Sequence, residues 1–221
     1  EIDRGILRWH QEKKDLPPNV ELLHQDLLKA DFGVLAERCG GLLKIVANLP
    51  YSVSNPLVFK LIENRDRMAW AVLMLQKEVA DRLTAAVGTK EYGILTVLLG
   101  SCATVTPLLR LGPEQFHPRP KVDSVVVRLD FHSLPERLRA LPAYDRLLLK
   151  QVVQSVFQQR RKTILNGLAA AWPAFGKEKW RTMLAAAGLS PQVRAERLNL
   201  EEFIRLTNVL AAELQAESGP H

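Results

Sequence analysis

Short apolar runs of strand length alternate with amphipathic, helix-like segments through residues 1–132. Such alternation predicts an α/β domain in which helices cover a largely parallel sheet. Strands are expected at 20–24, 42–47, 69–75, 103–109 and 124–131, and helices within 27–40 and at 55–62, 77–86 and 92–99. No helical segment separates the last two strands, which indicates an antiparallel pair at one edge of the sheet.

The pattern becomes wholly helical beyond residue 132. His132-Ser133-Leu134-Pro135 is expected to link a domain at 1–132 to an all-α domain at 133–221. Asp145 can cap the first long helix of the second domain, and Ser190-Pro191 can open a later one. Asn199 with Glu202 three residues on predicts a capping box at the start of the last helix.

Positive charge is concentrated in the second domain. Residues 1–132 carry 17 Lys and Arg against 16 Asp and Glu, a net charge of +1. Residues 133–221 carry 13 against 8, a net charge of +5. An excess of this kind favours a polyanionic partner such as nucleic acid, although a solvated basic surface explains the charge equally well.

Several other classes of protein are not expected. The longest apolar runs, such as 69–75, are too short to span a bilayer. Cys39 and Cys102 lack metal-ligand spacing and are expected to be buried thiols of a cytoplasmic protein. The five histidines are scattered, so no metal is expected. The chain opens at Glu1 without a methionine, and we expect that preceding residues are absent.

Asn48-Leu49-Pro50-Tyr51 follows the apolar run at 42–47 and suits methyl transfer to an exocyclic amino group of a nucleobase. The Asn48 side-chain oxygen and the Pro50 carbonyl can accept the two N–H bonds of that nitrogen, which directs its lone pair at an incoming methyl group. Proline presents its carbonyl rigidly, and Tyr51 can stack on the base. The same residue types are also common where a strand simply ends in a turn.

Three polar residues are expected at successive strand ends, namely Glu1, Asp26 and Asn48. Sheets of this class bind ligands at the carboxyl ends of their strands, and an acid at the second strand commonly bonds ribose hydroxyls. Glu1 suits that position, and Asp26 can accept an adenine amino group. Each residue alone fits a helix cap or turn as well, but together they indicate a nucleotide-like cofactor.

Phe116-His117-Pro118-Arg119-Pro120-Lys121-Val122-Asp123-Ser124 precedes the last expected strand. Its spaced prolines stiffen the loop, so Phe116 can face Tyr51 across an unstacked base. Arg119 and Lys121 can contact phosphate. The alternative is a rigid structural loop with a core phenylalanine.

Gln158-Gln159-Arg160-Arg161-Lys162-Thr163 is expected to continue an amphipathic helix. Arg160, Arg161 and Lys162 are consecutive and cannot all face a core. They suit phosphate groups of an RNA backbone. A solvated helix end, where cations are favoured by the helix dipole, is the alternative.

These blocks, together with Glu1-Ile2-Asp3-Arg4, Gln25-Asp26 and Leu75-Gln76-Lys77-Glu78-Val79, resemble the KsgA/RsmA ribosomal RNA adenine dimethyltransferases. The resemblance is collinear and covers essentially the whole chain. It implies S-adenosylmethionine-dependent dimethylation of N6 of two adjacent adenosines near the 3′ end of small-subunit ribosomal RNA, with a role in subunit assembly. It also implies a monomeric protein that acts on the small ribosomal subunit.

The resemblance assigns a role to each site residue. It implies that Glu1 holds the cofactor ribose and that Asp26 holds its adenine. Asn48 is implied to lie between cofactor and target nitrogen, while Tyr51 and Phe116 flank the target base.

One departure from the family pattern concerns the amino terminus. The glycine-rich loop of the family precedes the position of Glu1, as do the first strand, the first helix and most of the second strand. The expected fold is therefore a Rossmann-like class I methyltransferase sheet that lacks its first strand and glycine loop, plus a small all-α C-terminal domain. We expect a fragment that binds S-adenosylmethionine weakly or not at all and is itself inactive, because that loop approaches the methionine part of the cofactor.

Other functions remain open from the sequence. One is a large-subunit ribosomal RNA dimethyltransferase of the erythromycin-resistance type, which shares the tetrapeptide. A DNA adenine methyltransferase is disfavoured by Leu49, where those enzymes usually carry proline. The alternative of another class is a non-catalytic RNA binder, either a ribosome-assembly factor or a mitochondrial transcription factor.

Overall fold

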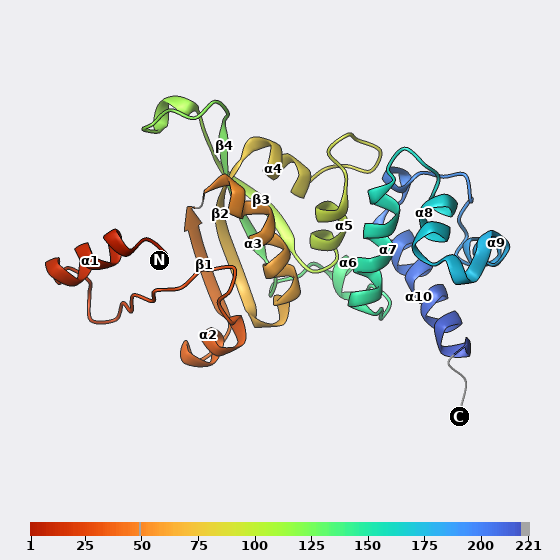
Figure 1. Ribbon diagram of the computed structural model, residues 1–221, viewed down its shortest axis with the longest axis horizontal. Coiled ribbons are helices and arrows are strands. Elements are labelled where there is room, and N and C mark those ends of the chain that lie inside the picture. The colour runs from red at the N-terminus through yellow and green to blue at the C-terminus, as the bar shows by residue number, and fades with distance from the viewer. Residues whose placement is uncertain (49, 218–221) are drawn as a thin grey trace.

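The computed structural model describes residues 1–48 and 50–217, apart from the side chain of Tyr51. Figure 1 shows three parts in a row. An N-terminal segment with helix α1 (Arg4–Lys13) lies at one end, a sheet with its helices lies in the centre, and a helical part closes the other end.

Four strands form the central sheet in the order β1-β2-β4-β3. Their bounds are β1 (Leu43–Asn48), β2 (Met68–Gln76), β3 (Thr104–Leu111) and β4 (Ser124–Asp130). β1 and β2 are parallel, whereas β4 runs antiparallel to both β2 and β3. Four of the five expected strands are thereby confirmed, as is the antiparallel pairing of the last two.

The strand expected at 20–24 does not form. Its backbone bonds a preceding turn and the first residue of the chain instead, with the Val20 N–H donating to the Pro17 carbonyl at 2.9 Å. The terminal amine of Glu1 donates to the Leu23 carbonyl at 2.9 Å, and the Gln25 N–H donates to the Glu1 carbonyl at 3.1 Å. An apolar run becomes a sheet strand only where a neighbouring strand pairs with its backbone groups, and here none does.

The helices of the central part are α2 (Phe32–Arg38), α3 (Tyr51–Glu63), α4 (Lys77–Leu83) and α5 (Ile94–Gly100), with short 3₁₀ turns η1 (Arg65–Arg67) and η2 (Pro113–Gln115). The expected start of a helix at residue 55 is wrong, because α3 begins one turn earlier. Pro50 at its N-cap has φ −55°, and its carbonyl accepts the Val53 N–H at 2.9 Å. Pro56 therefore lies inside the helix.

The helical part contains α6 (Glu136–Arg139), α7 (Arg146–Gln158), α8 (Ile164–Ala171), α9 (Gly176–Ala186) and α10 (Leu200–Glu217), with 3₁₀ turns η3 (Pro173–Phe175) and η4 (Ala195–Arg197). Both expected caps are confirmed. Asp145 accepts the Leu148 N–H at 2.9 Å, and Asn199 and Glu202 exchange two bonds of 2.8 and 2.9 Å.

Two expectations for the helical part are wrong. Ser190-Pro191 opens a turn followed by η4, because the Ser190 hydroxyl and carbonyl bond the nearby N–H groups of Gln192 and Val193. The cations at 160–162 do not continue α7, which ends at Gln158. The Lys162 N–H instead closes a turn on the Gln159 carbonyl at 2.7 Å.

Two buried clusters form the interior, and α5 contributes to both. Leu95 and Leu99 belong to the cluster under the sheet, whereas Val97 and Leu98 belong to the cluster of the helical part. The helical part therefore packs on a helix that precedes residue 132, and the domain division at 132/133 stays a prediction.

The cysteines differ in environment. Cys102 is buried as expected, but Cys39 is exposed because it follows the last turn of α2 at the surface. Within residues 1–48 and 50–217, no helix is both long and apolar enough to cross a membrane.

Candidate active site at the carboxyl edge of the sheet

One edge of the sheet gathers two of the segments singled out in the sequence, the end of β1 and the 112–123 loop. β1, β2 and β3 point the same way, since β4 is antiparallel to its two neighbours. Asn48 ends β1 beside Met74, while Ser124, the first residue of β4, lies opposite Gln76 and Leu111. The 112–123 loop therefore projects from the edge at which β1 ends (Figure 1).

Within the predicted catalytic tetrapeptide, Asn48 and Pro50 are the residues that the structure describes in full. Asn48 is the exposed last residue of β1. The Pro50 carbonyl accepts one backbone N–H, from Val53, and a carbonyl oxygen has a second lone pair for another donor. Leu49 and the Tyr51 side chain lie outside the described residues, so the stacking role of Tyr51 stays a prediction.

The helix behind the tetrapeptide is firmly held. Leu57, Val58 and Leu61 of α3 are completely buried. Because interiors are closely packed, these side chains fix the start of α3 relative to the sheet. The acceptors at residues 48 and 50 thus sit between a paired strand and an anchored helix, which is the kind of support that a preorganised site requires.

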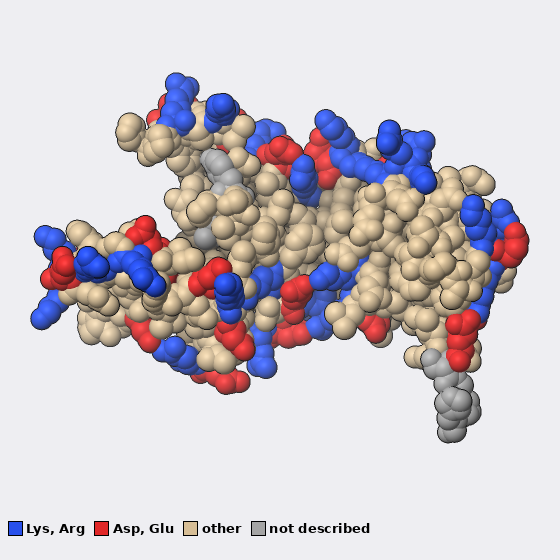
Figure 2. Space-filling model, in the orientation of Figure 1, with Lys and Arg blue, Asp and Glu red and all other residues tan. Residues whose placement is uncertain are grey.

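The 112–123 loop is tied to the same edge. Its last residue, Asp123, accepts the backbone N–H of Lys77 through its carbonyl at 2.9 Å. Phe116 is half-buried after η2, and Arg119 and Lys121 are exposed. Figure 2 shows positively charged side chains on this projecting loop and an open indentation between the loop and the N-terminal segment.

Asp26 does not end a strand, because none forms at 20–24, whereas the strand expected to end at Glu1 would lie before the first residue and stays a prediction. The structure joins the two segments through the backbone bonds of Glu1 with Leu23 and Gln25. One carboxylate oxygen of Glu1 accepts the N–H groups of Ile2 and Asp3, both at 2.8 Å. These two bonds hold the pKa of the exposed Glu1 carboxyl below its usual value, and the bond from Asp3 has the larger effect. Asp26 accepts the Leu28 N–H at 2.9 Å in a turn. Each acid keeps its second oxygen, Oε2 or Oδ2, for another donor.

A second basic region surrounds the end of α7. Arg160 is partly used within the fold, since it donates to the Thr89 carbonyl at 3.0 Å and lies 3.7 Å from a Glu196 oxygen. Arg161 and Lys162 line an open depression of about 720 Å³. Lys177 and Arg194 line it too. In Figure 2, Lys and Arg side chains gather along the upper edge of this helical part.

Sequence reasoning missed Lys177 and Arg194. Each is an isolated cation in a segment without a motif, and they meet Arg161 and Lys162 only because α8, α9 and η4 pack together around α7. No local spacing signals such a meeting.

Comparison with known proteins decides the family. The family model for "Ribosomal RNA adenine dimethylase" matches residues 1–212. This chain belongs to that family. The resemblance seen in the sequence is confirmed.

Curated relatives are similar to this chain over nearly its whole length. "Ribosomal RNA small subunit methyltransferase A" of Desulfotalea psychrophila is 53% identical over an alignment 222 residues long. The alignment covers 97% of this chain and 74% of the relative. The proteins of the same name from Syntrophus aciditrophicus and Escherichia coli are 38% and 37% identical. They are matched over 96% of this chain and over 75% and 73% of their own lengths.

Solved structures show the same fold. A dimethyladenosine transferase from Plasmodium falciparum superposes with a TM-score of 0.71 at 24% identity, over 96% of this chain and 81% of that chain. The 23S rRNA methyltransferase ErmE gives a TM-score of 0.63 at 23% identity, over 96% and 80%. This chain thus has the Rossmann-like methyltransferase fold with a C-terminal helical part. Fold alone does not separate the small-subunit and large-subunit enzymes, whereas the curated relatives carry the small-subunit name.

Proposed function

We propose that this chain is the catalytic polypeptide of an S-adenosylmethionine-dependent enzyme that dimethylates N6 of two adjacent adenosines near the 3′ end of small-subunit ribosomal RNA. The observation that carries the proposal is the acceptor pair of Asn48 and Pro50 at an exposed, well-anchored strand end. Its partners are the small-subunit RNA and the small ribosomal subunit. We further propose a monomer in the cytoplasm.

The residues present fit a nucleoside-containing cofactor. Two acidic residues, Glu1 and Asp26, lie in segments that the backbone bonds of Glu1 with Leu23 and Gln25 join. Carboxylates accept hydrogen bonds from ribose hydroxyls and from an adenine amino group. When bound, S-adenosylmethionine supplies an electrophilic methyl group.

Asn48 and Pro50 orient the target nitrogen. The Asn48 oxygen and the Pro50 carbonyl accept its two N–H bonds, so its lone pair faces the methyl group. Their contribution is positioning and fixed electrostatics, with no covalent bond to the protein. Methylation leaves a positive charge on the nitrogen, which loses a proton readily to water, so no general base is required.

Phe116 and Tyr51 are proposed to hold the extruded adenine between aromatic faces. Unpaired RNA presents such a base at the lowest cost of unstacking. Arg119, Lys121, Arg160, Arg161 and Lys162 are proposed to bind RNA phosphates, because all five are cations on the described surface.

The decisive experiment replaces Asn48 in a protein that carries residues 1–221 together with the family's glycine-rich loop. Small subunits without the modification are incubated with enzyme and S-adenosylmethionine, and methylated adenosines near the 3′ end are quantified by mass spectrometry. Asn48→Ala is expected to lower turnover by about 100-fold or more, a magnitude typical of a lost transition-state contact. Affinity for small subunits is expected to stay within about twofold.

Asn19→Ala is the matched control, because Asn19 is an exposed asparagine in a loop with no assigned role. It is expected to retain full turnover. Near-normal turnover by Asn48→Ala would refute the assigned role. Subunit binding without methylation by the unsubstituted protein would favour a non-catalytic assembly factor.

A further inference from the structure

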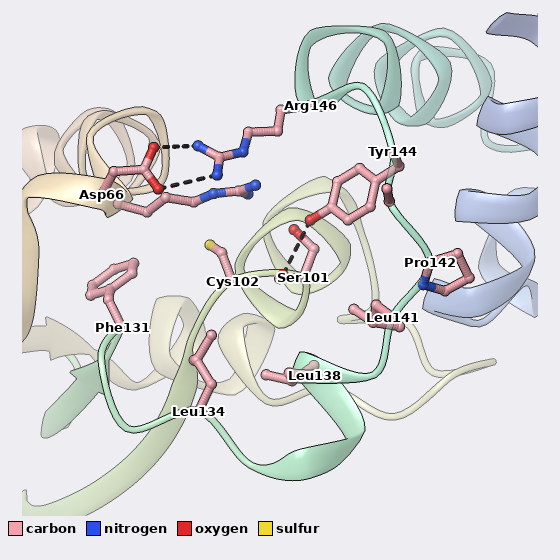
Figure 3. A pocket seen from close by; sticks show the side chains of 12 residues that line it. Asp66, Ser101, Cys102, Phe131, Leu134, Leu138, Leu141, Pro142, Tyr144 and Arg146 are labelled. Atoms are coloured by element: carbon pink, nitrogen blue, oxygen red, sulfur yellow. Dashed lines mark hydrogen bonds and ion pairs between the residues drawn. The ribbon is translucent and has the colours of Figure 1, made fainter.

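A cavity of about 340 Å³ lies at the opposite end of the sheet from Asn48 (Figure 3). Arg65 and Asp66 precede β2, Cys102 precedes β3, and Phe131 follows β4. The segment from Leu134 to Arg146, which leads into the helical part, closes the other side. The cavity is therefore separate from the proposed active site, and nothing argued below rests on the proposed function.

One side of the cavity wall is apolar. Figure 3 shows Leu134, Leu138 and Leu141 along one side, with Phe131 and Tyr144 at the two ends. Leu138 and Phe131 are buried, while Leu134 and Leu141 are half-buried. This wall offers an open apolar surface to the non-polar body of a ligand.

The remaining side of the cavity carries charge. Arg146 donates two hydrogen bonds to the Asp66 carboxylate, so these two charges neutralise each other (Figure 3). Arg65 is half-buried, and its guanidinium lies 5.9 Å from the centre of the Tyr144 ring. Arg65 makes no ion pair with any carboxylate of the described residues. The Asp66 carboxylate is influenced by both Arg146 and Arg65 but carries a single negative charge, so one net positive charge remains at the cavity.

The other polar groups of the wall are already used or neutral. The Tyr144 hydroxyl donates to the Ser101 carbonyl at 3.2 Å, and the Ser101 hydroxyl donates to the Leu98 carbonyl at 2.7 Å. Burial raises the pKa of the Cys102 thiol to about 11, even with Arg65 nearby. The thiol lies within hydrogen-bonding reach of Arg65, but as a neutral group it brings no negative charge and is not a nucleophile at neutral pH. The cavity is equipped for binding and not for covalent chemistry.

We propose that this cavity binds a small organic monocarboxylate with an apolar body. The carboxylate pairs with Arg65, whose planar guanidinium matches both oxygens. The apolar body lies against Leu134, Leu138 and Leu141. The net charge of +1 from Arg65, Arg146 and Asp66 suits one negative charge better than two, which favours a carboxylate over a phosphate dianion.

The test is isothermal titration of the 221-residue chain with 4-phenylbutyrate and with its uncharged analogue 4-phenylbutyramide at low salt. The carboxylate is expected to bind with one-to-one stoichiometry, and the amide about tenfold or more weakly. Arg65→Met, which keeps an unbranched apolar stem beside Tyr144, is expected to weaken 4-phenylbutyrate binding about tenfold. Arg67→Met is the matched control, because Arg67 belongs to the same 3₁₀ turn, is exposed and does not line the cavity.

Several results would overturn the proposal. Equal affinities for the carboxylate and the amide would exclude recognition of the charge, and equal losses in Arg65→Met and Arg67→Met would indicate general surface electrostatics. Absence of saturable binding up to about 10 mM would remove the site altogether. If Arg65→Met does not fold, Leu134→Trp provides the second variant: it fills the cavity, and unchanged 4-phenylbutyrate binding in it would equally refute the proposal.

Discussion

The hydroxyl of Tyr92 donates a 2.7 Å hydrogen bond to the backbone carbonyl of Leu198, 106 residues further along the chain. Both residues are buried, with exposed fractions of 4% and 1%. The bond joins the start of α5 to the segment before α10, and so connects the sheet part to the helical part.

Tyr92→Phe is expected to lower the free energy of unfolding by about 1–3 kcal/mol, because the buried Leu198 carbonyl loses its donor. Urea unfolding at neutral pH, followed by circular dichroism, measures this change. Tyr144→Phe is the control, since Tyr144 is only half-buried and its bond to Ser101 is longer, at 3.2 Å. An equal or larger loss in the control would contradict the special role of Tyr92.

The same substitution has a pH signature. Burial, with Glu201 and Glu202 nearby, raises the pKa of Tyr92 well above its usual value. In the unfolded chain the phenol loses its proton near pH 10, while in the folded chain it stays protonated. The folded state then binds more protons, so stability falls as the pH rises above about 10. Tyr92→Phe is expected to show a shallower alkaline loss of stability than the unsubstituted chain.

The Asp66–Arg146 ion pair also joins the two parts, but it lies at the surface. The exposed fractions of its side chains are 65% and 53%. Asp66→Asn is therefore expected to cost less than about 1 kcal/mol at pH 7. The hydrogen bond from Arg146 holds the pKa of Asp66 below its usual value, so this contribution is present above the unfolded pKa and is lost as the pH falls through the folded one. Thermal unfolding of Asp66→Asn and of the unsubstituted chain at pH 7 and at pH 3 checks both statements. A stability difference between the two proteins that is larger at pH 3 than at pH 7 would contradict the expected direction.

Arg161 and Lys162 are expected to contact RNA phosphates. Arg161→Gln with Lys162→Gln should weaken RNA binding and lower the slope of log K against log salt concentration by about 1–2. Arg137→Gln with Arg139→Gln removes the same charge from the exposed face of α6, outside the basic depression, and serves as the control. Filter binding of a small-subunit 3′-terminal RNA hairpin at several salt concentrations gives both slopes. Identical slopes in the two double variants would argue against phosphate contacts at 161 and 162.

Phe116 is expected to act through its aromatic face. Phe116→Leu keeps an apolar side chain of similar size but removes the ring, and should cost about 1–3 kcal/mol of binding to an unstacked base. Phe116→Tyr keeps the ring and should bind nearly as well. Equilibrium binding to RNA with 2-aminopurine at the target position measures the difference, and equal behaviour of both variants would assign Phe116 a structural role.

The 221-residue polypeptide is expected to bind S-adenosylmethionine weakly. The carboxylates of Glu1 and Asp26 each keep an oxygen for another donor, but the glycine-rich loop of the family is not within these residues. Calorimetric titration should give an affinity at least about tenfold lower than for the same polypeptide with the loop restored. Equal affinities would show that the loop contributes little.

Local features were readable from the sequence because neighbouring residues determine them. The strands β1 to β4 follow from apolar runs bounded by glycine, proline or polar residues. The caps at Asp145 and at Asn199 with Glu202 need only a side chain that reaches an N–H group three residues away. The tetrapeptide at 48–51, whose proposed chemistry depends on a position after a strand, belongs to the same class of local signal, and Asn48 does end β1.

Tertiary structure alone decided the features that need a distant partner. The run at 20–24 has strand composition but no paired neighbour, so it bonds Glu1 instead. Lys177 and Arg194 join Arg161 and Lys162 only through helix packing. Arg146, from the helical part, takes the hydrogen bonds of Asp66, so that carboxylate is shared between Arg146 and Arg65. The sequence shows which residues are apolar or charged. Only the fold determines which of them find partners, because each such contact depends on segments tens of residues apart.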